Sequence, residues 1–372
     1  MILDFERTLP VVMGLGPSGL FLARQLSKLG CPVAAIARPA DVGLHSNKIT
    51  PRLLRIATDQ DEVVSSLEAL SGEARERKIT ILVSSDQYLT ALLSLPGNRL
   101  LAYGLSAVDI ENFELINDKS RLGGRLSKIA SVPESYSVDS IDPNAFPCIV
   151  KWRQKHLDVK CEALPKVREI RSFSELKKLA GCLAREGFSV DDLIVQRLIL
   201  GDNSFQCSYG GYYQDGKLLA GIAVDQVRQY PQGISAYVVE SSNERGEAVK
   251  DAAVNLACSL DFSGFLEVEF KFDSNTGELF ILDVNPRPWG WISVLNAKYP
   301  QFHRVFLGEE PESIPEKVAW RTLPRDLLAN KNNMNARDVH SSEKTCLDIW
   351  DAKDMRPFFG LGLTAIKKAI SL

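Results

Sequence analysis

Residues 264–290 carry the side chains whose types and spacing best suit chemistry. Glu267 and Glu269 are two positions apart on a predicted strand, so they share one face of it. Asp283 and Asn285 have the same spacing on the next predicted strand, and a short turn joins the two strands. Pairing the strands can therefore bring carboxylates close together. Carboxylates on otherwise apolar strands repel one another unless a cation lies between them.

This set of residues predicts a magnesium site beside a phosphoryl group. Carboxylate and amide oxygens are hard ligands of the kind that Mg²⁺ takes, with water and phosphate oxygens completing the octahedron. Arg287 lies two residues beyond Asn285 on the same face, where its guanidinium can hold a transferring phosphoryl group. The competing interpretation is a solvated hairpin face with its charges turned outward. That interpretation explains any one carboxylate more easily than it explains the ordered set.

A second candidate is the glycine pattern of Gly14, Gly16 and Gly19, which follows an apolar segment and opens a predicted helix. Glycines allow a tight turn, and a helix N-terminus attracts anions, as in dinucleotide-binding folds. The next predicted strand ends at Arg38, without the acidic residue that an NAD enzyme uses, although an arginine suits the 2′-phosphate of NADP. Three interpretations stay open: a turn that packs helix on strand, an NADP site, or a pocket for an anionic substrate group.

The segment Asp283-Val-Asn285-Pro-Arg287 resembles the closing motif of the ATP-grasp superfamily. The similarity is to its carboxylate–amine ligase branch, near carbamoyl phosphate synthetase and biotin carboxylase. The preceding glutamate of that family matches Glu269. The resemblance implies that Glu269, Asp283 and Asn285 coordinate magnesium. It also implies that Arg287 is catalytic and contacts phosphate and an acyl-phosphate intermediate.

Further matches to the family precede this motif in the expected order. A lysine opens a predicted helix, a second lysine lies on a strand after a Phe-Pro step, and a later strand would hold adenine through its backbone. The two lysines would neutralise ATP phosphates as point charges, and an acidic residue would lie near the ribose. The nucleotide-binding set that the resemblance implies is Lys119, Lys151, Gln196, Arg197, Leu198 and Asp202, with the adenine contact at the backbone of Arg197 and Leu198.

Two features depart from the family pattern. Gln196 stands where many members have glutamate, and the loop after Lys151 lacks the glycines that usually close over the phosphates. Lys155, His156 or Lys160 would be the sources of positive charge in that loop, although solvent-facing charges are the favoured interpretation.

Outside these motifs, Arg228 is the second predicted catalytic residue. It stands on a predicted strand where related enzymes have a basic residue that faces the reacting carboxylate, and the alternative is an ordinary exposed arginine. Glu240, on the following strand, is a candidate contact for the amine. Trp289 and Trp291 are predicted to pack within the core more readily than to contact a ligand.

Composition excludes several classes of protein. The 372 residues predict two or three domains, and 45% apolar and 24% charged residues are ordinary for a globular protein. The net charge of −3 and the absence of a basic block argue against a nucleic-acid partner. No apolar run is long enough for a membrane span, and no secretory signal opens the sequence, so we expect a cytoplasmic protein. Seven scattered cysteines without a Cys-x-x-Cys pair predict reduced thiols and no zinc site.

The order of predicted elements gives the fold class. Alternating strands and helices over roughly residues 9–110 predict a Rossmann-like parallel sheet, whereas hairpins follow it. We therefore expect α/β plus α+β: an N-terminal Rossmann-like parallel sheet followed by a two-lobed ATP-grasp fold with antiparallel sheets. The predicted domains are 1–112 (Rossmann-like), 113–200 (first ATP-grasp lobe), 201–310 (second lobe, with the metal site) and 311–372 (an extension packed on the core).

The resemblance implies an ATP-dependent carboxylate–amine ligase that uses Mg²⁺ and forms an amide or peptide bond through an acyl phosphate, releasing ADP and phosphate. Its partners would be a small-molecule carboxylate and amine, such as an amino acid or peptide, and a homodimer is also expected. Three alternatives stay open. They are a ligase with a non-amine nucleophile, an NADP-dependent oxidoreductase that uses the Gly14–Gly19 loop, and a non-catalytic nucleotide-binding protein of the same fold.

Overall fold

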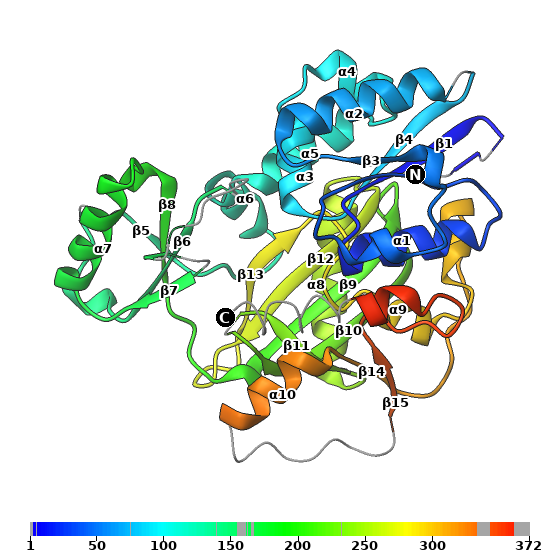
Figure 1. The fold of residues 1–372 in the computed structure, drawn as a ribbon. Helices are drawn as coiled ribbons and strands as arrows, with labels where there is room; N and C mark the ends of the chain where they lie inside the picture. Colours follow the sequence, from blue (N-terminus) through cyan, green and yellow to red (C-terminus); the bar gives the residue numbers. More distant parts are fainter. Residues whose placement is uncertain are drawn as a thin grey trace.

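The computed structural model contains three sheets, drawn in Figure 1. Among the described residues, no helix has both the length and the apolar character needed to cross a bilayer. The structure describes residues 3, 4, 6–74, 76–138, 140–154, 161, 163, 164, 167–231, 233–332 and 343–360, with the backbone alone for 330–332.

The N-terminal sheet is parallel and has the strand order β3-β2-β1-β4. From the central β1 the chain runs to β2 and β3 on one side and then to β4 on the other. Such a reversal opens a crevice at the carboxyl ends of β1 and β4, where ligands commonly bind in open α/β sheets. The elements are β1 (Thr8–Met13), α1 (Pro17–Ser27), β2 (Ala34–Ala37), η1 (Val42–His45), η2 (Pro51–Leu53), β3 (Leu54–Ile56), α2 (Gln60–Glu73), β4 (Lys78–Val83), α3 (Asp86–Leu93), α4 (Gly97–Ala102) and α5 (Ala107–Asn117).

The smallest lobe is an antiparallel sheet with the order β5-β8-β6-β7, and it lies to one side of the molecule in Figure 1. One amphipathic helix, α7, covers it by burying Leu176, Leu179 and Leu183 in the core of the lobe. The elements are α6 (Lys119–Leu126), β5 (Ser135–Tyr136), η3 (Pro143–Ala145), β6 (Cys148–Trp152), β7 (Val167–Ile170), α7 (Phe173–Arg185), η4 (Val190–Asp192) and β8 (Leu193–Arg197).

The largest sheet has seven strands in the order β13-β12-β9-β10-β11-β14-β15. Its pairs are antiparallel except for β14 and β15, which are parallel to each other. The elements are η5 (Asn203–Phe205), β9 (Gln206–Gln214), β10 (Lys217–Gln229), β11 (Ser235–Glu240), α8 (Glu244–Ser259), β12 (Gly264–Phe272), β13 (Leu279–Asn285), α9 (Val294–Lys298), η6 (Phe302–Leu307), β14 (Val318–Arg321), α10 (Leu323–Asn332) and β15 (Lys344–Leu347).

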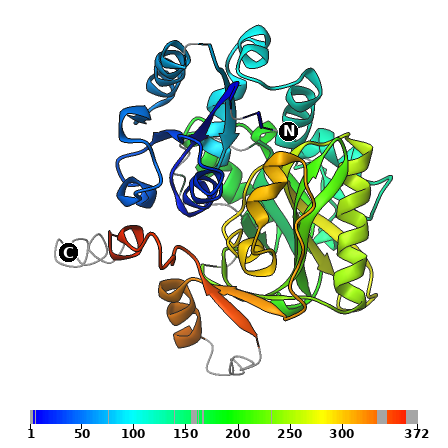
Figure 2. The same cartoon turned by 90° about the vertical axis from the view of Figure 1, so that its right-hand side faces the viewer.

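Both faces of the large sheet are covered. Helix α8 packs on the outer face, as Figure 2 shows at the right of the view. On the inner face, Tyr212 and Phe265 meet Phe21 of α1 and Phe302 of η6, so the N-terminal domain and the large sheet share one core. Trp289 is buried in this core against Gly210, where a Cβ atom would clash with the indole. The packing predicted for this tryptophan is confirmed.

The three sheets occupy different stretches of the sequence. The parallel sheet lies within 1–112 and the small sheet within 113–200. The large sheet, however, takes strands from both 201–310 and 311–372, because β14 and β15 extend it beyond β11. The C-terminal segment is thus part of the sheet as well as packed on the core.

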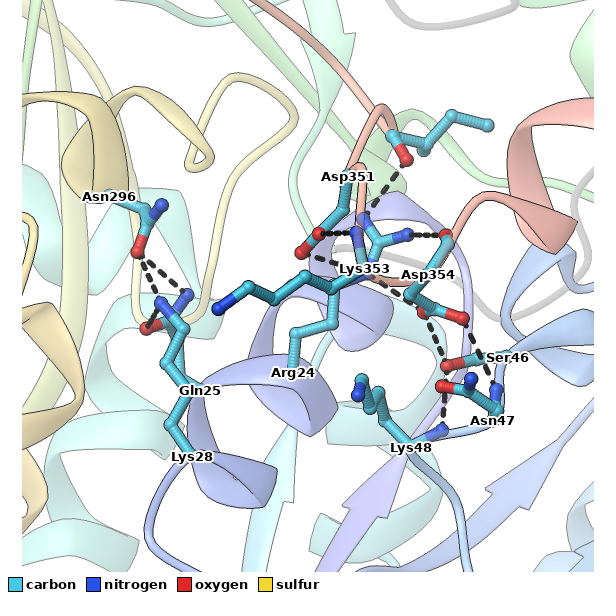
Figure 3. Close-up of polar contacts among 11 residues, drawn as sticks. Arg24, Gln25, Lys28, Ser46, Asn47, Lys48, Asn296, Asp351, Lys353 and Asp354 are labelled. Carbon is cyan, nitrogen blue, oxygen red and sulfur yellow. Dashed lines mark hydrogen bonds and ion pairs between the residues drawn. The ribbon is translucent and has the colours of Figure 1, made fainter.

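A buried ionic cluster fastens the C-terminal segment to α1 (Figure 3). The Arg24 guanidinium donates to Asp354 Oδ2 at 3.0 Å, to the Asp354 carbonyl at 2.8 Å and to the Ile349 carbonyl at 3.0 Å. The Asp354 carboxylate also accepts from the Ser46 hydroxyl at 2.6 Å and from the Asn47 N–H at 3.2 Å. Because the carboxylate and guanidinium are both buried and hydrogen-bonded, neither charge is left without compensation.

Candidate active site

The hairpin of β12 and β13 has the predicted register. Glu269 pairs with Asp283, and Glu267 pairs with Asn285. The Asn285 amide donates to Glu267 Oε2 at 3.0 Å and to Glu269 Oε1 at 3.2 Å, so these three side chains meet on one face. The expectation that strand pairing brings Glu269 to Asp283 is confirmed. Glu267 belongs to this cluster too, and its two-residue spacing from Glu269 was the signal for it.

Two lysines from the small lobe approach this hairpin. Lys119 forms an ion pair with Asp283, and the Lys151 ammonium donates to the Leu282 carbonyl at 3.2 Å. Lys119 is placed there because Asp118 caps α6, accepting from the Ser120 N–H at 2.9 Å. Burial alone would raise the pKa of Asp118, but hydrogen bonds from Arg153 and the backbone hold it below its ordinary value. The cap therefore stays charged and fixes the start of the helix.

The donor set fits a magnesium ion that is shared with phosphate. Glu269 and Asp283 provide carboxylate oxygens and Asn285 an amide, and the Lys119 ammonium already lies against Asp283 as a cation would. Among the described residues, no group of three or more His, Cys, Asp or Glu side chains is arranged to hold a metal ion. Phosphate oxygens and water would complete the shell of a bound magnesium ion.

A cavity of about 1110 Å³ opens between the small and large sheets. Its wall includes five of the six predicted nucleotide-binding residues: Lys151, Gln196, Arg197, Leu198 and Asp202. Lys119, the sixth, lines an adjoining pocket of about 250 Å³ together with Asp283, and Gln196 and Leu282 border both. The fold thus brings the predicted set together around two adjoining cavities.

The strand expected to hold adenine is β8 with the residues after it. The Arg197 side chain turns away to Asp273 at 3.2 Å, and its N–H already donates to the Glu134 carbonyl at 2.8 Å. The backbone of Leu198 is therefore better placed for an adenine contact than the N–H of Arg197. Asp202 accepts from the Ser204 hydroxyl at 2.6 Å, and that hydrogen bond lowers the pKa of Asp202, so this carboxylate is charged at the cavity wall.

Lys271 is a cavity residue that the sequence reasoning missed. It follows Glu269 by two positions on β12, so the same spacing argument would have found it. Burial lowers the pKa of Lys271.

Arg287 meets a carboxylate from the N-terminal domain. Its Nε donates to Asp86 Oδ1 at 2.7 Å and its Nη2 to Asp86 Oδ2 at 2.6 Å. Nη1 donates to the Pro288 carbonyl at 3.0 Å. Burial alone would lower the pKa of Arg287, but Asp86, with Glu267 and Asp283 nearby, raises it above its ordinary value. The guanidinium is thus permanently charged beside the predicted metal ligands.

Arg228 is not the exposed strand arginine of the alternative interpretation, because it is buried. Its fork is turned to Asp326 of α10, with Nη2 donating to Oδ2 at 3.1 Å, and the guanidinium stacks 4.7 Å from the centre of the Tyr237 ring. Arg228 still borders the cavity, so a contact with a substrate carboxylate stays a prediction. Glu240 pairs with Lys298 at 2.8 Å and accepts from the Val318 N–H at 3.0 Å, which gives it a structural role.

The glycine loop has the geometry of a packing turn. Gly14 has φ +87°, and a Cβ there would lie 2.5 Å from the Ser84 hydroxyl. A Cβ on Gly19 would clash with the Gly14 carbonyl. The Leu15 N–H, which a phosphate would use, donates instead to the Asp41 carboxylate at 2.8 Å. This arrangement favours the turn that packs helix on strand over both anion-binding interpretations. Lys155, His156 and Lys160 lie outside the described residues.

No family model matches the chain, and no curated protein matches it. Solved structures match its fold. An ADP complex of N5-carboxyaminoimidazole ribonucleotide synthetase has a TM-score of 0.64 at 14% identity, over 91% of this chain and 90% of that chain. The N5-carboxyaminoimidazole synthetase of Staphylococcus aureus gives 0.61 at 17% identity, over 92% of each chain.

The biotin carboxylase domain of a 2-oxoglutarate carboxylase from Hydrogenobacter thermophilus, in complex with MgADP, ADP and bicarbonate, also matches. Its TM-score is 0.61 at 12% identity, over 83% of this chain and 73% of that chain. At such identities the likeness shows the fold. The predicted fold class is therefore confirmed, and the chain has the ATP-grasp fold that these structures share.

Proposed function

We propose that the chain is an ATP-dependent ligase that activates a small carboxylate as an acyl phosphate and transfers the acyl group to an amine. ADP and phosphate would be the other products. One observation carries this proposal: the β12–β13 register pairs Glu269 with Asp283 while Lys119 and Lys151 face them from the small lobe. Acidic strands with two lysines in direct contact with the hairpin form a place for a metal-bound polyphosphate.

Each side chain then has a defined task. Glu269, Asp283 and Asn285 would hold Mg²⁺, which supplies charge neutralisation at the ATP phosphates. Lys119 and Lys151 would neutralise further phosphate charge, and the wall formed by Gln196, Leu198 and Asp202 would bind the nucleoside.

The reacting carboxylate would attack the γ-phosphorus while charge builds on the phosphoryl oxygens. Positioning and charge stabilisation supply most of the catalysis in such a transfer. Arg287 lies beside the predicted metal ligands and keeps its charge, so it would stabilise the phosphoryl group. Arg228 borders the cavity that holds the proposed nucleoside wall, and it would face the carboxylate. An amine would then attack the acyl carbon, and phosphate would leave.

The similar structures suggest which small molecules to test. One of them is titled with MgADP and bicarbonate, and others are named as carboxyaminoimidazole synthetases. Bicarbonate is therefore the first carboxylate for this chain, followed by amino acids and short peptides, each with a pool of primary amines. A homodimer stays a prediction that size-exclusion chromatography with light scattering would test.

The test begins with binding and ends with turnover. Mg-ATP should raise the thermal unfolding midpoint, whereas ATP with a chelator and NADPH should not, because only a ligand of the native state stabilises it. ADP release is then measured with the carboxylates and amines above. Asp283→Asn should remove the magnesium-dependent rise and slow ADP release by about 100-fold or more.

Asp251→Asn is the matched control, since Asp251 is exposed on α8, a helix on the outer face of the large sheet. It should behave as the wild type. A midpoint that rises with NADPH alone, or an Asp283→Asn variant that retains full ADP release, would overturn the proposal.

A further inference from the structure

Asp86 contributes a carboxylate to the site from a different domain. It lies 201 residues before Arg287, yet its two oxygens accept from Nε and Nη2 of the same guanidinium at 2.7 and 2.6 Å. Two parallel charge-assisted hydrogen bonds fix both the position and the plane of the guanidinium. A single acceptor would leave that plane free to rotate.

The remaining donors of Arg287 are almost all used. A guanidinium has five N–H groups. Three donate to Asp86 and the Pro288 carbonyl, and Nη2 has a long contact of 3.4 Å with Asn285 Oδ1. Among the described residues, one N–H of Nη1 then has no acceptor. Four acceptor atoms, from Asp86, Pro288 and Asn285, therefore orient the guanidinium and leave it a single remaining donor, while the charge of the group is retained.

The carboxylate itself is held by rigid elements. Asp86 is the first residue of α3, three positions after β4 ends at Val83, and the positive end of a helix favours a carboxylate there. The Ser84 hydroxyl donates to the Met13 and Gly14 carbonyls at 2.8 and 2.9 Å, which ties the end of β4 to the end of β1. Asp86 thus stands at the crevice where the strand order of the parallel sheet reverses.

We propose that Asp86 is a positioning residue, through which the N-terminal domain orients Arg287 for phosphoryl transfer. This inference rests on the function proposed above. It predicts that removing the Asp86 carboxylate slows phosphoryl transfer without weakening the binding of anions. Asp86 lowers the net positive charge felt by an anion, so its removal should leave anion binding equal or stronger. The rate should fall, because a guanidinium that keeps only the Pro288 and Asn285 contacts is held less firmly in the orientation that matches the transition state.

The experiment needs no knowledge of the natural substrates. Acetyl phosphate and Mg-ADP serve as probes: the β-phosphate oxygen of ADP attacks the phosphorus of acetyl phosphate, the acyl–oxygen–phosphorus bond to acetate breaks, and ATP and acetate form. ATP is measured by a luciferase assay. The thermal midpoint is measured with Mg-ADP alone and with Mg-ADP plus inorganic phosphate.

Asp86→Asn is compared with Glu68→Gln, which breaks the exposed ion pair with Arg99 in the same domain. We expect Asp86→Asn to form ATP at least tenfold more slowly while keeping the midpoint rise with Mg-ADP and phosphate. Glu68→Gln should match the wild type in both measurements.

The outcomes separate the two proposals. If the wild type forms no ATP, the proposed function fails, and this inference fails with it. If the wild type is active and Asp86→Asn is equally active, only the inference fails. It also fails if Asp86→Asn loses the midpoint rise together with activity, because Asp86 would then serve the fold and not the orientation of Arg287.

Discussion

The two arginines predicted to act on substrate are held in opposite ways. Arg287 and Asp86 meet at the edge of the site, with 18% and 27% of their side chains exposed. Arg228 and Asp326 meet inside the protein, with 6% and 0% exposed. In both pairs a fork of two hydrogen bonds joins the arginine to a carboxylate from another segment of the chain.

The difference lies in what surrounds each pair. Asp326 also accepts from Arg321, so two guanidinium groups share one buried carboxylate, and both lie over the Tyr237 ring. The Arg287–Asp86 pair instead lies beside the predicted metal ligands, and the carboxylates of Glu267 and Asp283 also act on the guanidinium. We infer that the buried pair chiefly sustains the fold, whereas the accessible pair serves chemistry.

The largest expected effect is on the buried pair. Asp326→Asn leaves two guanidinium groups without a buried counter-charge and should lower the free energy of unfolding by about 3–5 kcal/mol. Urea denaturation measures this loss. Asp86→Asn is the matched variant at the accessible pair, and it should lose no more than about 1 kcal/mol. Equal losses at the two positions would end the distinction between them.

The next effect is on rate. A lysine cannot form the planar fork that Arg287 makes, so Arg287→Lys should slow ADP release about 100-fold, equivalent to about 2.7 kcal/mol in the barrier. Its unfolding free energy should stay within about 1 kcal/mol of the wild type. Arg228→Lys should show the reverse, with the larger change in stability. Steady-state ADP release and urea denaturation of both variants measure the two effects. A larger rate loss in Arg228→Lys than in Arg287→Lys would contradict the assignment of Arg287 to chemistry and Arg228 to the fold.

The smallest expected effect is on the pH dependence of stability, and it concerns the carboxyl group of Asp348. Burial raises the pKa of Asp348 to about 7, although Arg325 and Arg24 oppose the shift. A carboxyl whose folded pKa lies above its unfolded value stabilises the fold below the unfolded pKa, and that stability is lost as pH rises toward 7. Asp348→Asn should therefore match the wild type near pH 3 and exceed it by roughly 1–2 kcal/mol at pH 8. Thermal unfolding across this pH range tests the sign, and an Asn variant that is less stable at pH 8 would refute it.

Local spacing was enough to predict one half of the site. Two-residue periodicity and a short turn predicted that Glu269 would pair with Asp283, and the register confirms it. The order of the lysine and strand motifs likewise predicted a set of side chains that the fold gathers at neighbouring cavities. The hairpin depends on contacts between neighbouring strands, which periodicity encodes directly, whereas the nucleotide-binding set was predicted from the family resemblance.

The partners of the two arginines could not be predicted in the same way. Asp86 is 201 residues from Arg287, and Asp326 is 98 residues from Arg228. The Asp86 contact exists only once the parallel sheet has packed against the large sheet, and the Asp326 contact only once α10 has formed after β14. No local sequence pattern encodes either contact. The glycine loop illustrates the same limit. Its spacing suits an anion site, but in the fold the Leu15 N–H donates to the Asp41 carboxylate, which follows it by 26 residues.

The cluster around Arg24 has a consequence for synthesis of the chain. Asp354 follows Arg24 by 330 residues, and Ile349 by 325, so the ribosome makes α1 long before any of these acceptors exists. During translation the guanidinium has to remain hydrated, because burying it without partners would be costly. The first helix can therefore close its packing only after Asp354 has emerged. A chain interrupted before Asp354 would keep the Arg24 face of α1 exposed to solvent. That exposed charge would distinguish the interrupted chain from one that includes Asp354.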